Sequence, residues 1–135
     1  AAPGIEILID ADESVLTLSD PDDMYQVIFN VVENAIKYNN PGGKVQIKVF
    51  KHGKFAELKV DDNGIGVPEE DLEHIFDRFY RVEKARSRET GGAGIGLAIV
   101  RDTIKKYKGE ITAERGELGG MCFSIKLPLY MEVKK

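Results

Sequence analysis

The chain has 135 residues, of which 42% are hydrophobic and 31% charged, and its formal net charge is −4. This length fits one compact domain, and the balanced composition excludes a disordered or collagen-like chain. The acidic balance disfavours nucleic-acid binding, which requires an excess of Lys and Arg toward the phosphates. Cys122 is the single cysteine, so no intramolecular disulfide can form, and we interpret it as a small apolar strand residue.

Short apolar runs at residues 5–10 and 15–19 flank an acidic turn and predict two strands. A helix start follows, because Ser19 and Asp20 offer capping side chains and Pro21 suits the first helical turn. From there to residue 39, apolar side chains recur at steps of three and four, which predicts a helix with one face against a sheet. The Asn-Asn-Pro-Gly-Gly string then ends this helix.

The rest of the chain alternates between hairpin, loop and helix patterns. We expect hairpins at residues 44–61 and 110–129, helices at 69–76 and 97–108, and an exposed charged loop at 77–93. This order predicts a mostly antiparallel sheet with helices on one face. No apolar run approaches the ~18 residues of a membrane span, so we expect no membrane contact by this segment.

Three polar side chains share one face of the first long helix. Asn30, Asn34 and Lys37 follow one another at steps of four and three, opposite the apolar stripe. Amide oxygens can bind Mg²⁺, and an ammonium group can neutralise phosphate. The alternative is an ordinary solvated helix face.

The string Asp62-Asn63-Gly64-Ile65-Gly66 directly follows an apolar strand. A carboxylate at a strand end can accept a hydrogen bond from an amino group, and glycines let the backbone approach a flat ring. The alternative is a simple turn, for which Asp-Asn-Gly is a common sequence.

A glycine-rich segment at residues 91–97 opens the second long helix. Its free N–H groups and the positive helix end suit phosphate binding, although it is neither a P-loop nor a dinucleotide fingerprint. A flexible hinge is the alternative. Several cations precede it in the charged loop, where each could contact a phosphoryl group or remain a solvated surface residue: Arg78, Arg81, Lys84, Arg86 and Arg88. Together with the two preceding features, these residues supply complementary contacts for ATP.

Four strings resemble, in order and spacing, the signature boxes of the histidine kinase catalytic domain, a member of the ATPase group that includes gyrase, a major chaperone class and MutL. NVVENAIKY is similar to the N box and DDNGIGVP to the first glycine box. IFDRFYR is similar to the phenylalanine box and GGAGIGLAIV to the second glycine box. The resemblance covers nearly the whole chain.

This resemblance implies a Bergerat-type fold, an α/β two-layer sandwich with a mixed sheet, three main helices and ATP under a flexible lid. We expect one domain over residues 1–135, with residues 1–4 as a linker and 77–93 as the lid. It implies that Asn34, assisted by Asn30, binds Mg²⁺, that Lys37 and Arg81 contact phosphate, and that Asp62 accepts from the adenine amino group. The other implied nucleotide contacts are Tyr38, Gly64, Ile65, Gly66, Ile75, Gly92, Ala93, Gly94, Ile95, Gly96 and Leu97.

One position separates kinases from hydrolases within the group. Members that hydrolyse ATP generally carry glutamate four residues before the magnesium asparagine, and this chain has Asn30 there, which cannot take a proton from water. Glu33 is rotated about 100° around the helix from Asn34 and is a poor substitute. The sequence therefore favours phosphoryl transfer to a protein. A nucleotide sensor without catalysis and a hydrolytic ATPase remain the alternatives.

Two departures from the family pattern concern the adenine site and the phosphoacceptor. Met121 follows Gly120 where the family often has threonine, so the hydroxyl contact to adenine is missing or rebuilt. The acceptor pattern is absent, and His52 and His74 read as surface histidines. We therefore expect the acceptor on a separate dimerisation domain and a response regulator as an indirect partner. The resemblance implies a cytoplasmic domain of a membrane-anchored protein.

Overall fold

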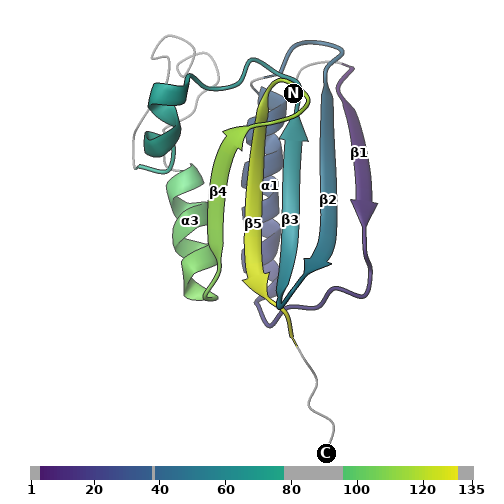
Figure 1. Cartoon of the computed structure of the whole chain (residues 1–135), viewed down its shortest axis with the longest axis vertical. Coiled ribbons are helices and arrows are strands. Elements are labelled where there is room, and N and C mark those ends of the chain that lie inside the picture. The colour runs from purple at the N-terminus through teal and green to yellow at the C-terminus, as the bar shows by residue number, and fades with distance from the viewer. Residues whose placement is uncertain (1–3, 38, 78–95, 131–135) are drawn as a thin grey trace, which may run out of the picture.

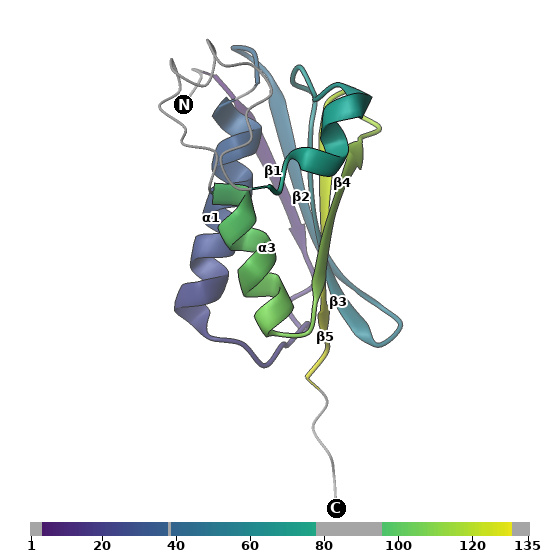
Figure 2. The same cartoon turned by 90° about the vertical axis from the view of Figure 1, so that its left-hand side faces the viewer.

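The computed structural model describes residues 4–37, 39–77 and 96–130, which form a five-stranded sheet with helices on one of its faces (Figures 1 and 2). The strand order is β1-β2-β3-β5-β4, with β1 parallel to β2 and every other pair antiparallel. The strands are β1 Glu6–Ala11, β2 Lys44–His52, β3 Phe55–Asp62, β4 Glu110–Arg115 and β5 Met121–Pro128. The predicted mixed, mostly antiparallel two-layer sandwich is confirmed.

Helix α1 (Pro21–Lys37) begins where its capping sequence predicts. The Asp20 carboxylate is the cap, since its Oδ1 accepts hydrogen bonds from the main-chain N–H of Asp22 at 2.8 Å and of Asp23 at 3.4 Å. Three apolar side chains on one stripe of α1 are buried against the sheet and the neighbouring helix: Val27, Val31 and Ala35.

The core lies between the sheet and the two long helices, α1 and α3 (Gly96–Lys106). Its most completely buried side chains come from both layers, which shows that the predicted apolar faces meet: Val31, Val45, Val60, Val100 and Ile104. Cys122 is 7% exposed in β5, so its predicted place as a small strand residue is confirmed.

Three predicted elements differ from the structure. Residues 15–19 do not form a strand, because this segment meets the sheet through one isolated bridge between Thr17 and Leu129. The predicted helix at 69–76 is a shorter 3-10 helix, η1 (Glu69–His74). Helix α3 ends at Lys106, two residues early, because Lys108 adopts a φ of 62° and the Gly109 N–H donates to the Ile104 carbonyl at 3.0 Å.

The termini of several elements meet at one end of the sandwich, the upper end in Figure 1. There β3 ends, β5 begins and α1 ends, while α3 begins on the same side beneath η1 (Figure 2). Helices α1 and α3 are antiparallel, so the start of α1 lies beside the end of α3 at the opposite, lower end. The two ends of this helix pair therefore present different groups of side chains.

Candidate nucleotide-binding site

Asp62, the last residue of β3, is a buried carboxylate held in one orientation. The residue is 5% exposed, and its Oδ1 accepts hydrogen bonds from the main-chain N–H of Gly64 at 2.9 Å and of Met121 at 3.3 Å. Burial raises the pKa of Asp62, and the two main-chain hydrogen bonds oppose that rise. The strand end thus carries an oriented hydrogen-bond acceptor, which is what the sequence predicts for this position.

Two glycines allow the chain to close around this carboxylate. A Cβ on Gly120 would lie 2.1 Å from Asp62 Oδ1 and 2.6 Å from the Asp62 carbonyl oxygen, to which the Gly120 N–H donates at 3.1 Å. Gly66 has a φ of +73°, and a Cβ there would lie 3.8 Å from the Gly120 backbone. Gly120 is therefore a site residue that the sequence reasoning missed, because Gly119-Gly120 looks like a hairpin turn.

Met121 contacts the site through its main chain. Its side chain is 5% exposed and belongs to the core, while its N–H donates to Asp62. A thioether cannot replace the hydroxyl of the family's threonine. The hydrogen bond that orients Asp62 is independent of that hydroxyl, so the substitution leaves this part of the site intact.

The polar residues of α1 lie beside its buried stripe, and not opposite it as the sequence predicted. Asn30 and Asn34 are half-buried and lie one turn apart, about 100° and 60° around the helix from Val31. Lys37 pairs with Glu33, with 3.1 Å between Lys37 Nζ and Glu33 Oε1 and with both side chains about one-third exposed or more. Such an exposed pair contributes only about 0.3–0.5 kcal/mol, so an incoming phosphate can displace Glu33.

The start of α3 is the described part of the predicted phosphate side. Gly96 is the first residue of the helix, and a Cβ there would meet no other described atom within 4 Å. Leu97 is half-buried and packs against the core. The first turn of α3 carries no acidic residue that would compete with an anion for the helix N-terminus. The remaining predicted contacts lie outside the described residues: Tyr38, Arg81, Gly92, Ala93, Gly94 and Ile95.

Two predicted adenine contacts have different surroundings. Ile75 is 8% exposed and belongs to the core, whereas Ile65 is 46% exposed. Phe76 follows Ile75 and packs edge-to-face on Phe123 of β5, with 6.3 Å between ring centroids. This contact fixes the segment after η1 against the sheet beside the site. Gly64 is half-buried, and its N–H donates to Asp62 Oδ1.

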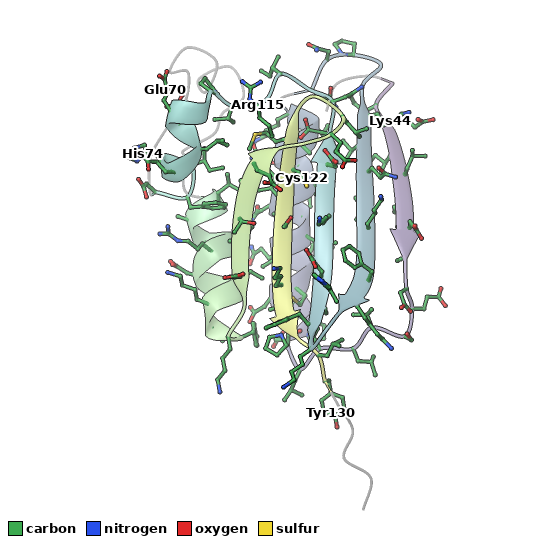
Figure 3. All side chains as sticks on the ribbon, in the orientation of Figure 1. Lys44, Glu70, His74, Arg115, Cys122 and Tyr130 are labelled. Atoms are coloured by element: carbon green, nitrogen blue, oxygen red, sulfur yellow. The ribbon has the colours of Figure 1, made fainter. Side chains whose placement is uncertain are left out.

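A hydrogen-bond network of two asparagines, Asn39 and Asn63, supports the same end of the sandwich. The sequence pattern around Asn39 predicted only the end of the helix. Asn39 is 9% exposed, and its Nδ2 donates to the Lys44 carbonyl at 3.2 Å. The Lys44 N–H donates to Asn63 Oδ1 at 2.7 Å. A Cβ on Gly43 would lie 2.2 Å from Asn39 Oδ1, so the glycine is required. Hydrogen bonds therefore join the end of α1, the start of β2 and the residue after Asp62. Figure 3 labels Lys44 at the start of β2.

Asp61 precedes Asp62 but faces the opposite side of the sheet, where it pairs across the strands with Cys122, labelled in Figure 3. Its Oδ1 is buried without a hydrogen-bond partner among the described residues. Burial, followed by the charges of Asp62 and Glu117, raises the pKa of Asp61. The alternation of strand side chains thus places Asp62, and not Asp61, in the site.

The two histidines lie on the surface, as predicted. The side chain of His52 is 71% exposed in the β2–β3 hairpin, where Nδ1 lies 3.0 Å from Glu57 Oε2. The side chain of His74 is 45% exposed on η1 (Figure 3), and its ring nitrogens contact Glu73 and Asp77. Among the described residues, no group of three or more His, Cys, Asp or Glu side chains could hold a metal ion, and within the same ranges no helix is long and apolar enough to cross a membrane.

Residues 19–131 match the family described as histidine kinase-, DNA gyrase B-, and HSP90-like ATPase. The sensor histidine kinase RppB of Synechocystis is 43% identical over 107 residues, which are 79% of this chain and 24% of RppB. The mycobacterial sensor histidine kinase MprB superposes with a TM-score of 0.81 at 27% identity, over 93% of this chain and 83% of that one.

Another similar structure is that of a longer protein in complex with AMPPNP. Full-length ShkA in complex with AMPPNP superposes with a TM-score of 0.77 at 29% identity, over 97% of this chain and 27% of that one. The two-layer sandwich matches the solved structures of histidine kinase catalytic domains. The chain belongs to the family of histidine kinase-, DNA gyrase B- and HSP90-like ATPases.

The predicted resemblance to the histidine kinase catalytic domain is confirmed, and the predicted enzyme class, protein-histidine kinase, is that of the relatives. The chain spans about a quarter of the length of RppB and of ShkA.

Proposed function

We propose that this domain binds ATP with Mg²⁺ and donates the γ-phosphoryl group to a histidine on a separate dimerisation domain, as one step of two-component signalling. The observation that carries the proposal is the convergence, at one end of the sandwich, of the oriented Asp62 carboxylate, the Asn30–Asn34 face and the N-terminus of α3. The AMPPNP complex of the similar protein ShkA supports a triphosphate as the ligand.

The adenine ring is assigned to the end of β3. The Asp62 carboxylate accepts a hydrogen bond from the exocyclic amino group of adenine. The N–H groups of Gly64 and Met121 already hold this carboxylate in place, which lowers the entropic cost of binding. Residues Gly64–Gly66, Ile75 and Tyr38 line the base. This assignment requires no adenine contact from the side chain of Met121.

The triphosphate is assigned to the space between α1 and α3. Mg²⁺ takes few protein ligands and keeps water and phosphate oxygens, so two half-buried amide oxygens on one helix turn, Asn30 and Asn34, fit it. When bound, the metal neutralises phosphate charge. Lys37 exchanges its exposed partner Glu33 for phosphate. Arg81 in the lid, residues 77–93, and the N–H groups of residues 92–97 complete the phosphate contacts.

The reaction is a phosphoryl transfer in which an imidazole nitrogen of the acceptor attacks the γ-phosphorus and the bond to the leaving ADP oxygen breaks. The domain contributes position and electrostatic stabilisation to this step. The Asn30 amide cannot accept the proton of an attacking water, so hydrolysis lacks its base. We assign the domain to the cytoplasm, where ATP and the response regulator are present.

Binding and transfer can be tested separately. Calorimetry with ATP and ADP in the presence of Mg²⁺ should show nucleotide binding by the 135-residue chain alone. Phosphotransfer to an added dimerisation domain that carries the acceptor histidine should follow, and γ-labelled ATP alone should label the chain hardly at all. Binding without transfer would mean a nucleotide sensor, whereas multiple-turnover phosphate release would mean a hydrolase.

A further inference from the structure

The start of α1 and the end of α3 are joined by a polar cluster far from the nucleotide site, here called the interhelix clamp: Asp20, Asp23, Lys106 and Tyr107. The Tyr107 hydroxyl accepts a hydrogen bond from the Asp20 N–H at 3.2 Å and donates one to Asp23 Oδ2. Lys106 Nζ donates to the same Asp23 oxygen at 3.1 Å and lies 5.4 Å from the centroid of the Tyr107 ring. One hydroxyl thus contacts both the cap and the first turn of α1.

The α3 side of this clamp is fixed to the sheet. Tyr107 is partly buried against the core, and the preceding Ile104 is fully buried. A Cβ on Gly109 would lie 2.3 Å from the Lys126 carbonyl oxygen, so the chain leaving α3 lies directly on β5. The sheet therefore fixes the position of the Tyr107 hydroxyl, and the hydrogen bonds of this hydroxyl attach the start of α1 to it.

The α1 side of the clamp is a charged acceptor. The hydrogen bond from Tyr107, followed by that from Lys106, lowers the pKa of Asp23, so its carboxylate is ionised at neutral pH. Hydrogen bonds to a charged acceptor are stronger than those between neutral groups. The side chain of Asp23 is 33% exposed and that of Lys106 is 64% exposed, so the partly buried hydroxyl is the less solvated of the two donors.

The clamp and the phosphate-binding residues lie at opposite ends of the same helix pair (Figure 2). Asp23 is in the first turn of α1 and Asn34 in its last, about 16 Å away at 1.5 Å per residue. Gly96 and Lys106 are the first and last residues of α3. A rotation of α1 by about 4° at the clamp moves its far end by ~1 Å, an error that can cost a binding or catalytic site much of its function.

We propose that the interhelix clamp sets the spacing between the phosphate-binding ends of α1 and α3, with Tyr107 and Asp23 as positioning residues for the nucleotide phosphates. The inference rests on the proposed ATP site, because it concerns the Asn30–Asn34 face and the start of α3. The adenine carboxylate, Asp62, is held by β3, β5 and the following loop, and neither helix contributes to its hydrogen bonds. The clamp therefore acts on the phosphates and leaves the base contact unchanged.

The test is the affinity of the chain for Mg·ATP compared with its affinity for adenosine, which has the base without the phosphates. Tyr107→Phe deletes the hydroxyl and keeps the ring. It should weaken Mg·ATP binding roughly 3- to 10-fold, the effect of losing one charge-assisted hydrogen bond at a distance, and change adenosine binding less than about 2-fold. NMR titration measures both ligands. Tyr25→Phe is the matched control, because Tyr25 is 71% exposed on α1 and stacks on Phe29.

Two Asp23 variants separate positioning from general stability. Asp23→Asn keeps an acceptor for the Tyr107 hydroxyl but loses the charge, so it should weaken Mg·ATP binding less than Tyr107→Phe does. Asp23→Ala should weaken Mg·ATP binding at least as much as Tyr107→Phe, because it also removes the Lys106 contact, and the loss in the double variant should be smaller than the sum of the two single losses, because both remove the bond between Tyr107 and Asp23. A lower unfolding temperature with an unchanged ratio of ATP to adenosine affinity would overturn the inference while the proposed function stands. Absence of ATP binding by the unmodified chain would overturn both.

Discussion

The main-chain N–H of Met121 donates a hydrogen bond to the Asp62 carboxylate from a position 59 residues further along the chain. The same oxygen accepts from the neighbouring Gly64 N–H, so a local turn and a long-range strand pair hold one side chain together. The acceptor is thus oriented before any ligand arrives, and a ligand amino group pays little entropy to meet it.

Asp62→Asn tests this acceptor directly. The asparagine oxygen can still accept from Gly64, but the negative charge is lost and the amide NH₂ cannot accept from adenine. We expect ATP affinity to fall by roughly 1.5–3 kcal/mol in calorimetry. Asp61→Asn is the matched control, because it makes the same chemical change on the other face of the sheet. Equal affinity of Asp62→Asn and the unmodified chain would remove Asp62 from the site.

Gly120→Ala tests the close contact between the β4–β5 hairpin and the end of β3. The new Cβ would lie 2.1 Å from Asp62 Oδ1 and 2.6 Å from the Asp62 carbonyl oxygen, so backbone must move. We expect a loss of more than about 2 kcal/mol in the free energy of unfolding, together with weakened ATP binding. Gly96→Ala, where a Cβ meets no described atom within 4 Å, should leave the free energy of unfolding nearly unchanged. Urea denaturation compares the two, and similar losses would contradict the contact.

Local sequence patterns predict much of the fold but less of the candidate site. The start of α1 and the two hairpins follow from capping residues and alternation, which act between neighbours in the chain. The segment at 15–19 has the same alternation but finds a single bridge at Thr17, because strand formation depends on a partner. The role of Gly120 depends on its packing against Asp62, which no local pattern reports.

Within the site, the sequence predicts which side chains lie together when a single helix or strand carries them. Asn30 and Asn34 lie one turn apart on α1, so helical periodicity alone places them together. Strand alternation separates Asp61 from Asp62, but which of them faces the helices is decided by the register with β5. Lys37 and Glu33 are four residues apart on one helix, so their ion pair could also have been predicted from the sequence.

Asp61 should make the stability of the domain depend on pH. Its pKa is raised above 3.8 in the folded state, so folding favours the protonated form. The resulting penalty is absent at low pH, grows as the pH rises from 3.8 through the raised pKa, and is constant above it. Asp61→Asn should therefore stabilise the domain at pH 7 by a few tenths to about 1 kcal/mol, a range limited by solvent screening. Urea denaturation should show this gain shrinking toward pH 4, and a gain independent of pH would contradict the assignment.

Asn30 is the residue that distinguishes transfer from hydrolysis, and Asn30→Glu tests it by adding a base. If Asn30 lies beside the bound triphosphate, a carboxylate there can take the proton of an attacking water and give steady phosphate release over multiple turnovers. Gln26→Glu is the control, since it places the same new charge one turn earlier on α1, farther from Asn34. The unmodified chain should release no phosphate over multiple turnovers. Steady release by the unmodified chain would contradict the kinase assignment, and equal release by both glutamate variants would mean that added charge, and not proton transfer at Asn30, is responsible.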